Sequence, residues 1–459
     1  MSRLGSIVLA AVMGLLSTQY AGAVELTESA TDSRTFQTKS QVHTTGQVFT
    51  LSSEGKKDPL KLAATAQLQF RSRRLPPAGR DAEALRSVRE FEVARVDTEV
   101  SGFKTAVVLP AQLKTVVASG TREGVRSYCP EVLMTREALD LLEMPGDPLA
   151  LIALLPLESV EVGGTWSPNE WVIQMLSGVE AAESSQMTCT LESADQTTAV
   201  FAFTGDVKGQ RLGAVSTVQF TGRVQYNVAE KFISAAKLRY SVKSEVGTIN
   251  PGLEALVDVD FTRSLSNTPG MLTDAYVQNI PLNAPATALE LVFDAVPWGL
   301  RLLHGRDWHL FQAVFESSES QHAVAILRMV DQGALVSQCN IAPVTNVQPG
   351  KRTPPQEFER DIQTSLGSRL TKLSEQEDIP TQNGRYIYRV VAEGEVEISG
   401  DKGGVKIPMN WIYYLCTNSD GRQVSFVFAV EPELRETLGQ QDRNIVTSAS
   451  FFAIPQAGR

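Results

Sequence analysis

The residues best suited to chemistry in this 459-residue chain form one short run, His304-Gly305-Arg306-Asp307-Trp308-His309. Imidazole nitrogens and a carboxylate are ligands that zinc and similar metals accept, so His304, Asp307 and His309 are the candidate metal ligands. Gly305 instead indicates a tight turn that would splay these side chains, and a metal site also needs supporting hydrogen-bond partners. We therefore favour a hairpin turn with solvated histidines over a metal-dependent hydrolase, and we predict no metal site.

A cysteine–histidine nucleophile is the second chemical possibility. Cys339 would supply the thiolate and His304 or His309 the base, but no local signature of such an enzyme surrounds them. The chain also lacks the G-x-S-x-G, H-E-x-x-H, P-loop and strand-linked G-x-G-x-x-G motifs. We predict that the protein is not an enzyme and has neither catalytic residues nor a cofactor.

Arginine is concentrated between Arg71 and Arg95. This stretch holds seven arginines and four acidic residues, a local charge of +3. A surface of this kind could bind an anionic glycan or a lipid headgroup. The alternative is a solvated, irregular loop around Pro76-Pro77-Ala78-Gly79, which is the more ordinary origin of such a charge run.

The overall composition excludes several classes of protein. Hydrophobic residues make up 42% of the chain, which argues against disordered and collagen-like proteins. There are 52 acidic and 42 basic residues, giving a net charge of −10. This balance argues against a general affinity for nucleic acid or for an anionic bilayer.

The first 23 residues are typical of a signal peptide. One positive charge at Arg3 precedes an uncharged apolar stretch from Leu4 to Ser17, and Ala21-Gly22-Ala23 is a small-x-small cleavage pattern. The apolar stretch would rise about 21 Å as a helix, too short for a bilayer core of about 30 Å. The first cysteine is Cys129, so a lipoprotein anchor at the cleavage site is excluded. We expect a secreted or periplasmic protein that does not span a membrane.

The four cysteines leave two interpretations open. An oxidising compartment permits disulfides, and the spacing favours pairing within halves, Cys129 with Cys189 and Cys339 with Cys416. Cys189 and Cys416 nevertheless lie in apolar, strand-like segments, where cysteine behaves as a small buried hydrophobe.

Hydrophobic periodicity divides the mature chain into two domains. Residues 24–264 alternate between apolar and polar residues, most clearly from Ala214 to Tyr226, which predicts half-buried antiparallel strands. Two helices interrupt them, one after Thr135 and one after the capping box at Ser167, and residues 148–157 indicate a core helix or loop. Residues 265–288 have the composition of a linker.

Residues 289–459 combine further strands with a helix that a capping box at Thr353 opens, with Pro354 at the first helical position. An apolar stripe predicts that this helix continues through Leu373: Phe358, Ile362, Leu366, Leu370 and Leu373. One helix between two groups of strands and another at the end predict a layered α+β domain. The fold class predicted for the whole chain is therefore α+β, with a curved sheet or half-barrel first.

Two resemblances accompany these patterns. Leu154-Leu155-Pro156, Val162 to Trp166, Gly205 to Gly209 and Gly213-Ala214 are similar to a group of exported bacterial proteins of unknown function. Several segments of the second domain resemble the PsbP/Mog-like α/β/α sandwich, namely 328–330, 338–341, 355–366, 411–415 and 420–430. This second resemblance implies an α/β/α sandwich with an antiparallel sheet, and a binding or accessory role rather than catalysis.

Two function classes follow. The first is an exported, non-enzymatic binding or accessory protein of the cell envelope that engages another protein. The second is a carrier that encloses a lipid or another hydrophobic ligand on the apolar face of a half-barrel. An apolar cavity of ~300 Å³ or more on that face would favour the carrier, and a packed interior would count against it.

Overall fold

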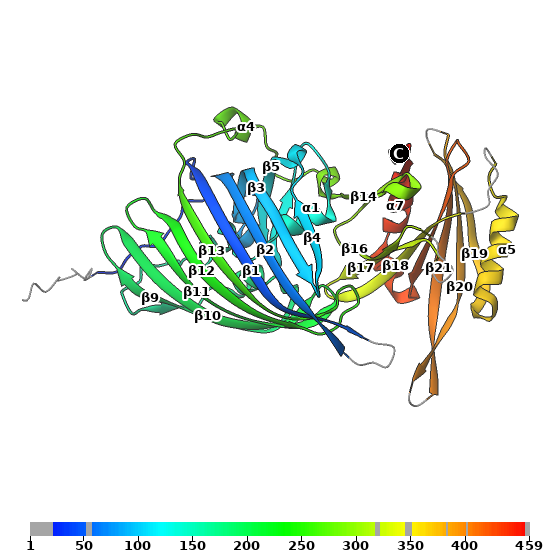
Figure 1. Cartoon of the computed structure of the whole chain (residues 1–459), viewed down its shortest axis with the longest axis horizontal. Coiled ribbons are helices and arrows are strands. Elements are labelled where there is room, and N and C mark those ends of the chain that lie inside the picture. The colour runs from blue at the N-terminus through cyan, green and yellow to red at the C-terminus, as the bar shows by residue number, and fades with distance from the viewer. Residues whose placement is uncertain are drawn as a thin grey trace, which may run out of the picture.

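The protein has two β-rich parts that lie side by side along the long axis of the molecule (Figure 1). The computed structural model describes residues 22–51, 57–316, 322–344, 351–381, 384–400 and 403–454. Almost all of the predicted signal peptide therefore lies outside the described residues. Among the described helices, none has the length and apolar character needed to cross a bilayer.

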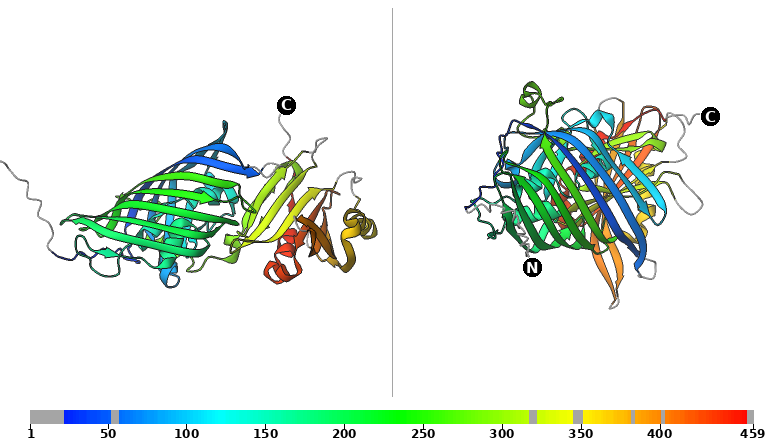
Figure 2. Two further views of the ribbon diagram at one scale, coloured as in Figure 1. Left: turned by 90° about the horizontal axis from the view of Figure 1, so that it is seen from below. Right: turned by 60° about the vertical axis from the view of Figure 1, so that its left-hand side comes forward.

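The first part is built on one curved antiparallel sheet of twelve strands (Figure 2). Its main path runs β6-β5-β3-β2-β1-β13-β12-β11-β10-β9-β8, and β4 pairs with β3. The strands are β1 (Thr35–Leu51), β2 (Lys57–Arg74), β3 (Arg86–Val100), β4 (Phe103–Val108), β5 (Thr115–Thr121), β6 (Gly124–Tyr128), β8 (Thr165–Trp166), β9 (Ala181–Ala194), β10 (Thr198–Arg211), β11 (Ala214–Asn227), β12 (Phe232–Ser244) and β13 (Gly252–Leu265).

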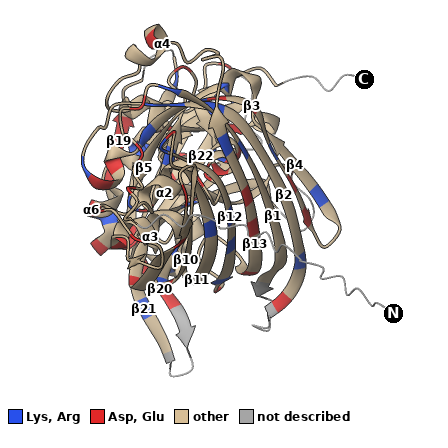
Figure 3. Ribbon diagram, turned by 90° about the vertical axis from the view of Figure 1, so that its left-hand side faces the viewer, with Lys and Arg blue, Asp and Glu red and all other residues tan. Residues whose placement is uncertain are grey.

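Alternating burial confirms the predicted strand pattern. Along β11, Val218, Phe220 and Val224 are buried, whereas Gln219 and Gln225 are exposed. Charged residues of both signs lie along the strands of the curved sheet (Figure 3). Several of them form ion pairs between neighbouring strands. These pairs include Arg239–Asp258, Arg223–Glu192 and Lys208–Glu183. These paired side chains remain hydrated, so the outer face of the sheet is exposed to solvent.

Helices fill the inner face of this sheet. They are α1 (Arg136–Leu142), α2 (Pro148–Ala153) and α3 (Glu170–Ser177). α2 and α3 share one apolar core with the strands, and Leu26 enters the same core from the N-terminal segment. Both predicted helices are present: Thr135 accepts a hydrogen bond from the amide of Ala138, and α3 ends at Gly178 with a left-handed φ of 66°. The predicted capping box at Ser167 is wrong, because Asn169 is the N-cap of α3 and no side chain caps it.

The stretch predicted as a linker, residues 265–288, packs along one edge of the curved sheet. It contains α4 (Asp274–Gln278), and Leu272 is fully buried against Leu75, Val88 and Val117. Arg86 of β3 donates to the carbonyl of Pro281 at 3.0 Å. These contacts hold the stretch against the first part.

The second part contains two further sheets. A seven-stranded sheet has the order β16-β17-β18-β22-β21-β20-β19, and a four-stranded sheet has the order β23-β15-β14-β7. The strands are β7 (Met134–Thr135), β14 (Leu291–Ala295), β15 (Leu300–His304), β16 (Trp308–Val314), β17 (Val324–Asp331), β18 (Ala334–Pro343), β19 (Leu370–Ile379), β20 (Tyr386–Gly400), β21 (Gly403–Thr417), β22 (Gln423–Val430) and β23 (Ser450–Phe451).

The predicted α+β fold class with an α/β/α sandwich is wrong. One face of the seven-stranded sheet packs on α5 (Pro355–Leu366), but the other packs on strands β14 and β15 together with the short helices α6 (Arg435–Leu438) and α7 (Gln441–Ser448). Strands dominate the described residues, and no described α-helix exceeds the twelve residues of α5. The architecture is predominantly antiparallel β, because a small sheet takes the place expected for a helical layer.

The predicted bounds of the helix after Thr353 are also wrong. Pro354 rather than Thr353 is the N-cap of α5, and no side chain caps it. α5 ends at Leu366, Gly367 follows with φ 53°, and Leu370 begins β19. Leu370 and Leu373 continue the helical spacing by coincidence: they belong to a strand whose pairing with β20 shifts register at both residues.

A short parallel pairing joins the two parts. β7 belongs in sequence to the first part and pairs with β14 of the second. Arg136 of α1 donates to the carbonyl of Trp308 at 3.0 Å, and Arg306 donates to the carbonyl of Ser127 at 2.6 Å. These bonds across the junction position the hairpin between β15 and β16 against α1.

Candidate functional site

The sequence candidates for metal binding do not form a metal site. His304 ends β15, only 4% of it is exposed, and its Nδ1 lies 2.8 Å from the carbonyl of Gly305. In the described part of the chain, no three His, Cys, Asp or Glu residues are arranged to hold a metal. The predicted turn at Gly305 is present, but the expectation that both histidines are solvated is wrong for His304.

The cysteines are buried and free. Cys129, Cys189, Cys339 and Cys416 form no disulfide, and Cys339 is fully buried in the core of the second part. Burial raises the pKa of the Cys339 thiol well above its usual range. The thiolate required of a nucleophile is therefore unavailable at neutral pH.

The arginine-rich stretch does not form a single surface patch. Arg95 is exposed and pairs with Asp97, whereas Arg74, Arg86 and Arg89 are buried. Arg89 forms a bidentate pair with Asp147 at 2.6 and 2.7 Å. These arginines therefore divide between the outer surface and the interior of the first part.

A polar pocket of about 400 Å³ lies between the two parts, and we call it the junction pocket. α1 and the hairpin tips of the first part line one side of it, and the β15–β16 and β17–β18 hairpins line the other. Its charged lining comprises five carboxylates and three guanidinium groups: Glu123, Glu143, Glu180, Asp307, Asp331, Arg126, Arg136 and Arg306.

The arginines of the junction pocket are largely engaged by the protein. Arg136 donates to the carbonyls of Arg306 and Trp308, and Arg306 donates to those of Leu289 and Ser127. Glu180 accepts from the amide of Leu212 at 2.9 Å. Among described residues, by contrast, no hydrogen bond or ion pair engages the carboxylates of Glu123, Asp307 and Asp331. On the arginine side, Arg126 donates to no described residue, and Nε of Arg136 and Nη1 of Arg306 are buried without a hydrogen-bond partner, so unsatisfied groups of both signs line the pocket.

Two pocket residues have strongly shifted pKa values. Burial raises the pKa of Glu143 to about 7, although Arg306 lies 3.6 Å away and opposes the shift. Burial lowers the pKa of His309 to about 3, and the charge of Arg136 adds to this effect. His309 is therefore neutral at physiological pH, while Glu143 titrates within the physiological range.

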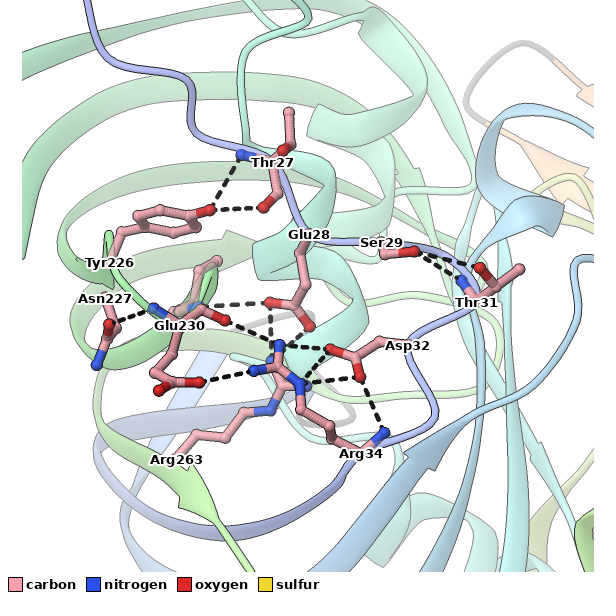
Figure 4. Close-up of polar contacts among 11 residues, drawn as sticks. Thr27, Glu28, Ser29, Thr31, Asp32, Arg34, Tyr226, Asn227, Glu230 and Arg263 are labelled. Atoms are coloured by element: carbon pink, nitrogen blue, oxygen red, sulfur yellow. Dashed lines mark hydrogen bonds and ion pairs between the residues drawn. The ribbon is translucent and has the colours of Figure 1, made fainter. Parts of the chain in front are cut away.

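A second charged cluster lies at one end of the inner face, beneath residues 27–34 (Figure 4). The Glu28 side chain is 0% exposed and accepts two bonds from Nη1 of Arg263, at 2.7 and 2.9 Å. Arg263 also stacks over the ring of Phe36, 3.8 Å from its centroid. The hydroxyl of Tyr226 donates to the carbonyl of Thr27 at 2.5 Å. Side chains, rather than sheet pairing, hold this segment over the inner face.

Arg34 links the same segment to the β11–β12 turn. It pairs with Asp32 at 2.7 Å and with Glu230 at 3.0 Å. Burial opposes ionisation of Asp32, but the hydrogen bonds and charge of Arg34 outweigh it and lower the pKa of Asp32. A cavity of about 610 Å³, which we call the N-terminal cavity, opens beside this cluster and is lined by residues 27–29, 31–34 and 229–231.

Sequence reasoning did not identify either charged site. Glu28 and Arg263 are 235 residues apart in the chain, and Glu143 and Arg306 come from different parts. The only sequence feature that pointed to the junction pocket was the run from His304 to His309. This run contributes Arg306, Asp307 and His309 to the lining of the pocket.

No protein-family model matches the chain, and no curated protein matches it. Among solved structures, lipovitellin, in a study of its lipid–protein interactions, is 9% identical with a TM-score of 0.30, and the match covers 52% of this chain and 26% of lipovitellin. The chain thus spans about a quarter of that protein.

Two further structures cover more of the chain at lower similarity. The complex of MucB with MucA(peri) is 11% identical over 92% of this chain and 96% of that one, with a TM-score of 0.15. OccK11 (OpdR) of Pseudomonas aeruginosa is 8% identical over 88% of this chain and 99% of that one, with a TM-score of 0.13. TM-scores below 0.5 define neither a shared fold nor a shared function.

Proposed function

We propose that this chain is an exported, non-enzymatic binding protein of the cell envelope whose partner is another protein. The observation that carries the proposal is the junction pocket, which both parts of the chain build and which holds unsatisfied carboxylates. Recessed pockets with a few convergent polar groups are the usual sites at which a ligand or a partner side chain is anchored.

The charge of the pocket indicates what it would bind. Its lining holds five carboxylates and three guanidinium groups. Arg136 and Arg306 donate to backbone carbonyls, whereas Asp307 and Asp331 accept no bond from any described residue. Burial raises the pKa of Asp307 and the charge of Asp331 raises it further, while Arg126, Arg136 and Arg306 oppose the shift without cancelling it. A further cation beside Asp307 would therefore be stabilised. A lysine or arginine side chain of the partner fits this requirement.

Support for a non-catalytic role comes from the same residues. Burial raises the pKa values of the Cys189, Cys339 and Cys416 thiols, and His304 lies 2.8 Å from a backbone carbonyl. No metal-ligating group of three residues occurs in the described ranges. Burial alone accounts for the raised pKa of Glu143, and its ion pair with Arg306 opposes the shift, so the raised value is no sign of catalysis.

The carrier alternative has less support. The inner face is filled by α2, α3 and Leu26, and the larger N-terminal cavity at its end is lined almost entirely by polar and charged residues. The cavity near Phe70 and Met144 measures about 10 Å³. That volume is about one water molecule. A hydrophobic ligand would have to displace packed core residues to enter.

A site-specific crosslink tests the proposal. A photo-crosslinking amino acid would replace Gln332, which lines the pocket, and as a matched control Gln219, which is exposed on the outer face of β11. We expect one envelope protein to be crosslinked at 332 and not at 219, and the double change Asp307→Asn and Asp331→Asn to reduce its yield at least tenfold. Equal labelling from both positions, or labelling that the double change leaves intact, would refute the proposal.

A further inference from the structure

β16 forms one free edge of the seven-stranded sheet and borders the junction pocket. In the described part of the chain it pairs with β17 on one side and with no strand on the other. Asp307, just before this strand, and His309, within it, both line the junction pocket. The free edge therefore begins where the proposed partner site lies.

The bonds at the start of β16 fix the direction of its backbone groups. The amide of Val330 on β17 donates to the carbonyl of Asp307 at 2.9 Å, so this carbonyl points toward β17. The carbonyl of Trp308 points the other way, because it accepts from Arg136 of α1. Since successive residues of an edge strand alternate, the N–H and C=O groups of Leu310 also point away from β17. Among the described residues, no group on that side bonds to them.

The two edges of this sheet differ in their protection against pairing with another chain. Edge strands usually carry charged residues or proline, which discourage the addition of a further strand. β19, the opposite edge, carries four charged residues in a strand of ten, namely Lys372, Glu375, Glu377 and Asp378. β16 has neither a charged residue nor a proline from Leu310 to Val314. Its sequence therefore lacks the side chains that protect β19.

Apolar side chains are exposed along the same edge. Leu310 is 39% exposed and Phe311 is 41% exposed. A β-bulge leaves Phe311 without a partner on β17, and its ring lies under the guanidinium of Arg328, whose Cζ is 3.5 Å from the ring centroid. An added strand would therefore find apolar contacts beside the main-chain groups.

We propose that the partner adds an extended segment to the free edge of β16 and places a lysine or arginine of that segment in the junction pocket. The inference rests on the proposed function, because it uses the same partner and the same pocket. Main-chain bonds to Leu310 supply affinity, and the basic side chain pairs with Asp307. Three residues of extended chain span about 10 Å, so the basic residue lies about three positions beyond the residue opposite Leu310.

A second copy of this chain is the alternative occupant of the edge. Residues 310–316 contain no lysine or arginine, and Glu316 follows the strand. Two β16 strands paired with each other would therefore bring no cation to Asp307. A segment of another protein that combines an extended stretch with a basic residue satisfies both the edge and the pocket.

Crosslinking from two glutamines tests the position of the partner. Gln312 on β16 and Gln376 on β19 are both exposed on edge strands of one sheet, so Gln376 is the matched control. Each would be replaced, in the full chain in the cell envelope, by the photo-crosslinking amino acid used at Gln332. We expect the protein captured from 332 to be captured from 312 as well, with at least tenfold lower yield from 376.

Substitutions of Leu310 test the main-chain pairing. Leu310→Pro removes the outward N–H, whereas Leu310→Thr keeps that N–H and suits a strand. With the crosslinker at 332, we expect Leu310→Pro to lower the yield at least tenfold and Leu310→Thr to lower it less than threefold. Circular dichroism verifies that both variants fold; should Leu310→Pro not fold, the comparison of 312 with 376 decides.

The outcomes separate this inference from the proposed function. Capture from 332 but not from 312, equal yields from 312 and 376, or equal yields from folded Leu310→Pro and Leu310→Thr would overturn the inference and leave the proposed function standing. Capture of a second copy of this chain from 312 would also overturn it. The absence of specific capture from 332 would refute the proposed function, and the inference with it.

Discussion

Nη1 of Arg306 lies 3.6 Å from Oε1 of Glu143, an ion pair that joins the β15–β16 hairpin of the second part to the end of α1 in the first. The same Oε1 accepts from the amide of Ser127 at 3.3 Å. The pair sits in the junction pocket, where burial raises the pKa of the carboxyl to about 7. The contact between the two parts therefore includes a group that titrates near neutral pH.

Glu143→Gln should change the pH dependence of stability. Because the folded-state pKa of about 7 exceeds the ordinary 4.5, the contribution of Glu143 is fully present below pH 4.5 and is lost as the pH rises through 7. The free energy of unfolding of Glu143→Gln, relative to wild type, should therefore rise by about 1 kcal/mol between about pH 5 and pH 8. We expect no more than this, because the Glu143 side chain is 34% exposed and solvent screens its charge.

Urea unfolding at the two pH values measures this difference. Glu137→Gln, at an exposed position of the same helix, is the matched control and should show no such rise. A relative stability of Glu143→Gln that is constant or falls over this range would contradict the prediction.

His304 should produce a slope of the opposite sign. Burial lowers its pKa to about 4, so its contribution is present above the ordinary 6.5 and is lost as the pH falls through 4. His304→Asn retains a donor for the carbonyl of Gly305 but cannot titrate. Between pH 7 and pH 4, wild type should lose about 3 kcal/mol more than His304→Asn, as measured by urea unfolding. Parallel losses in the two proteins would disprove this account of His304.

Local patterns in the sequence predicted the local structure well. The alternation from Ala214 to Tyr226 corresponds to β11. Thr135 lies at the start of one helix and Gly178 at the end of another, as predicted. Each of these signals depends on residues that are close together in the chain. The spacing of Leu370 and Leu373 wrongly predicted helix for the same reason. That spacing is a local pattern, whereas the strand that contains both residues is determined by its pairing with β20.

Long-range contacts account for what the sequence did not reveal. The turn at Gly305 was predicted, but the burial of the adjacent Trp308 depends on α7, where Gln441 accepts from its indole nitrogen at 2.7 Å. The partners of Glu28 and Arg34 depend on how the N-terminal segment crosses the curved sheet. No periodicity or motif encodes that path, so both charged sites emerged only from the structure.

Glu28→Leu should strongly destabilise the first part. It would leave Arg263, whose side chain is 3% exposed, as a buried charge without its counterion, which costs about 3–5 kcal/mol. The double change Glu28→Leu and Arg263→Met removes both charges and should restore most of this loss. Asp258→Asn, in the solvated pair with Arg239, should cost less than about 1 kcal/mol. Urea unfolding of the four proteins measures these values, and a double variant no more stable than Glu28→Leu would contradict the expected coupling.

The positions of Cys339 and Cys416 exclude a disulfide between them. Cys339 on β18 faces Phe428 of β22, and Cys416 on β21 faces Val424 of β22. β22 therefore separates the two cysteines, which places their backbones about 9.6 Å apart even before the offset along the strands. A disulfide requires Cα atoms within about 7 Å.

Thiol titration without reductant should therefore find four free thiols per chain, all of them hidden until the protein unfolds. A disulfide-reactive chromogenic reagent should react negligibly with the native protein, because Cys189, Cys339 and Cys416 are fully buried and burial raises their pKa values. In denaturant, the same sample should yield four equivalents, and prior reduction should leave the thermal midpoint unchanged. Two equivalents in denaturant, or a midpoint that falls on reduction, would show that a disulfide forms and that the strand positions around it differ from those described.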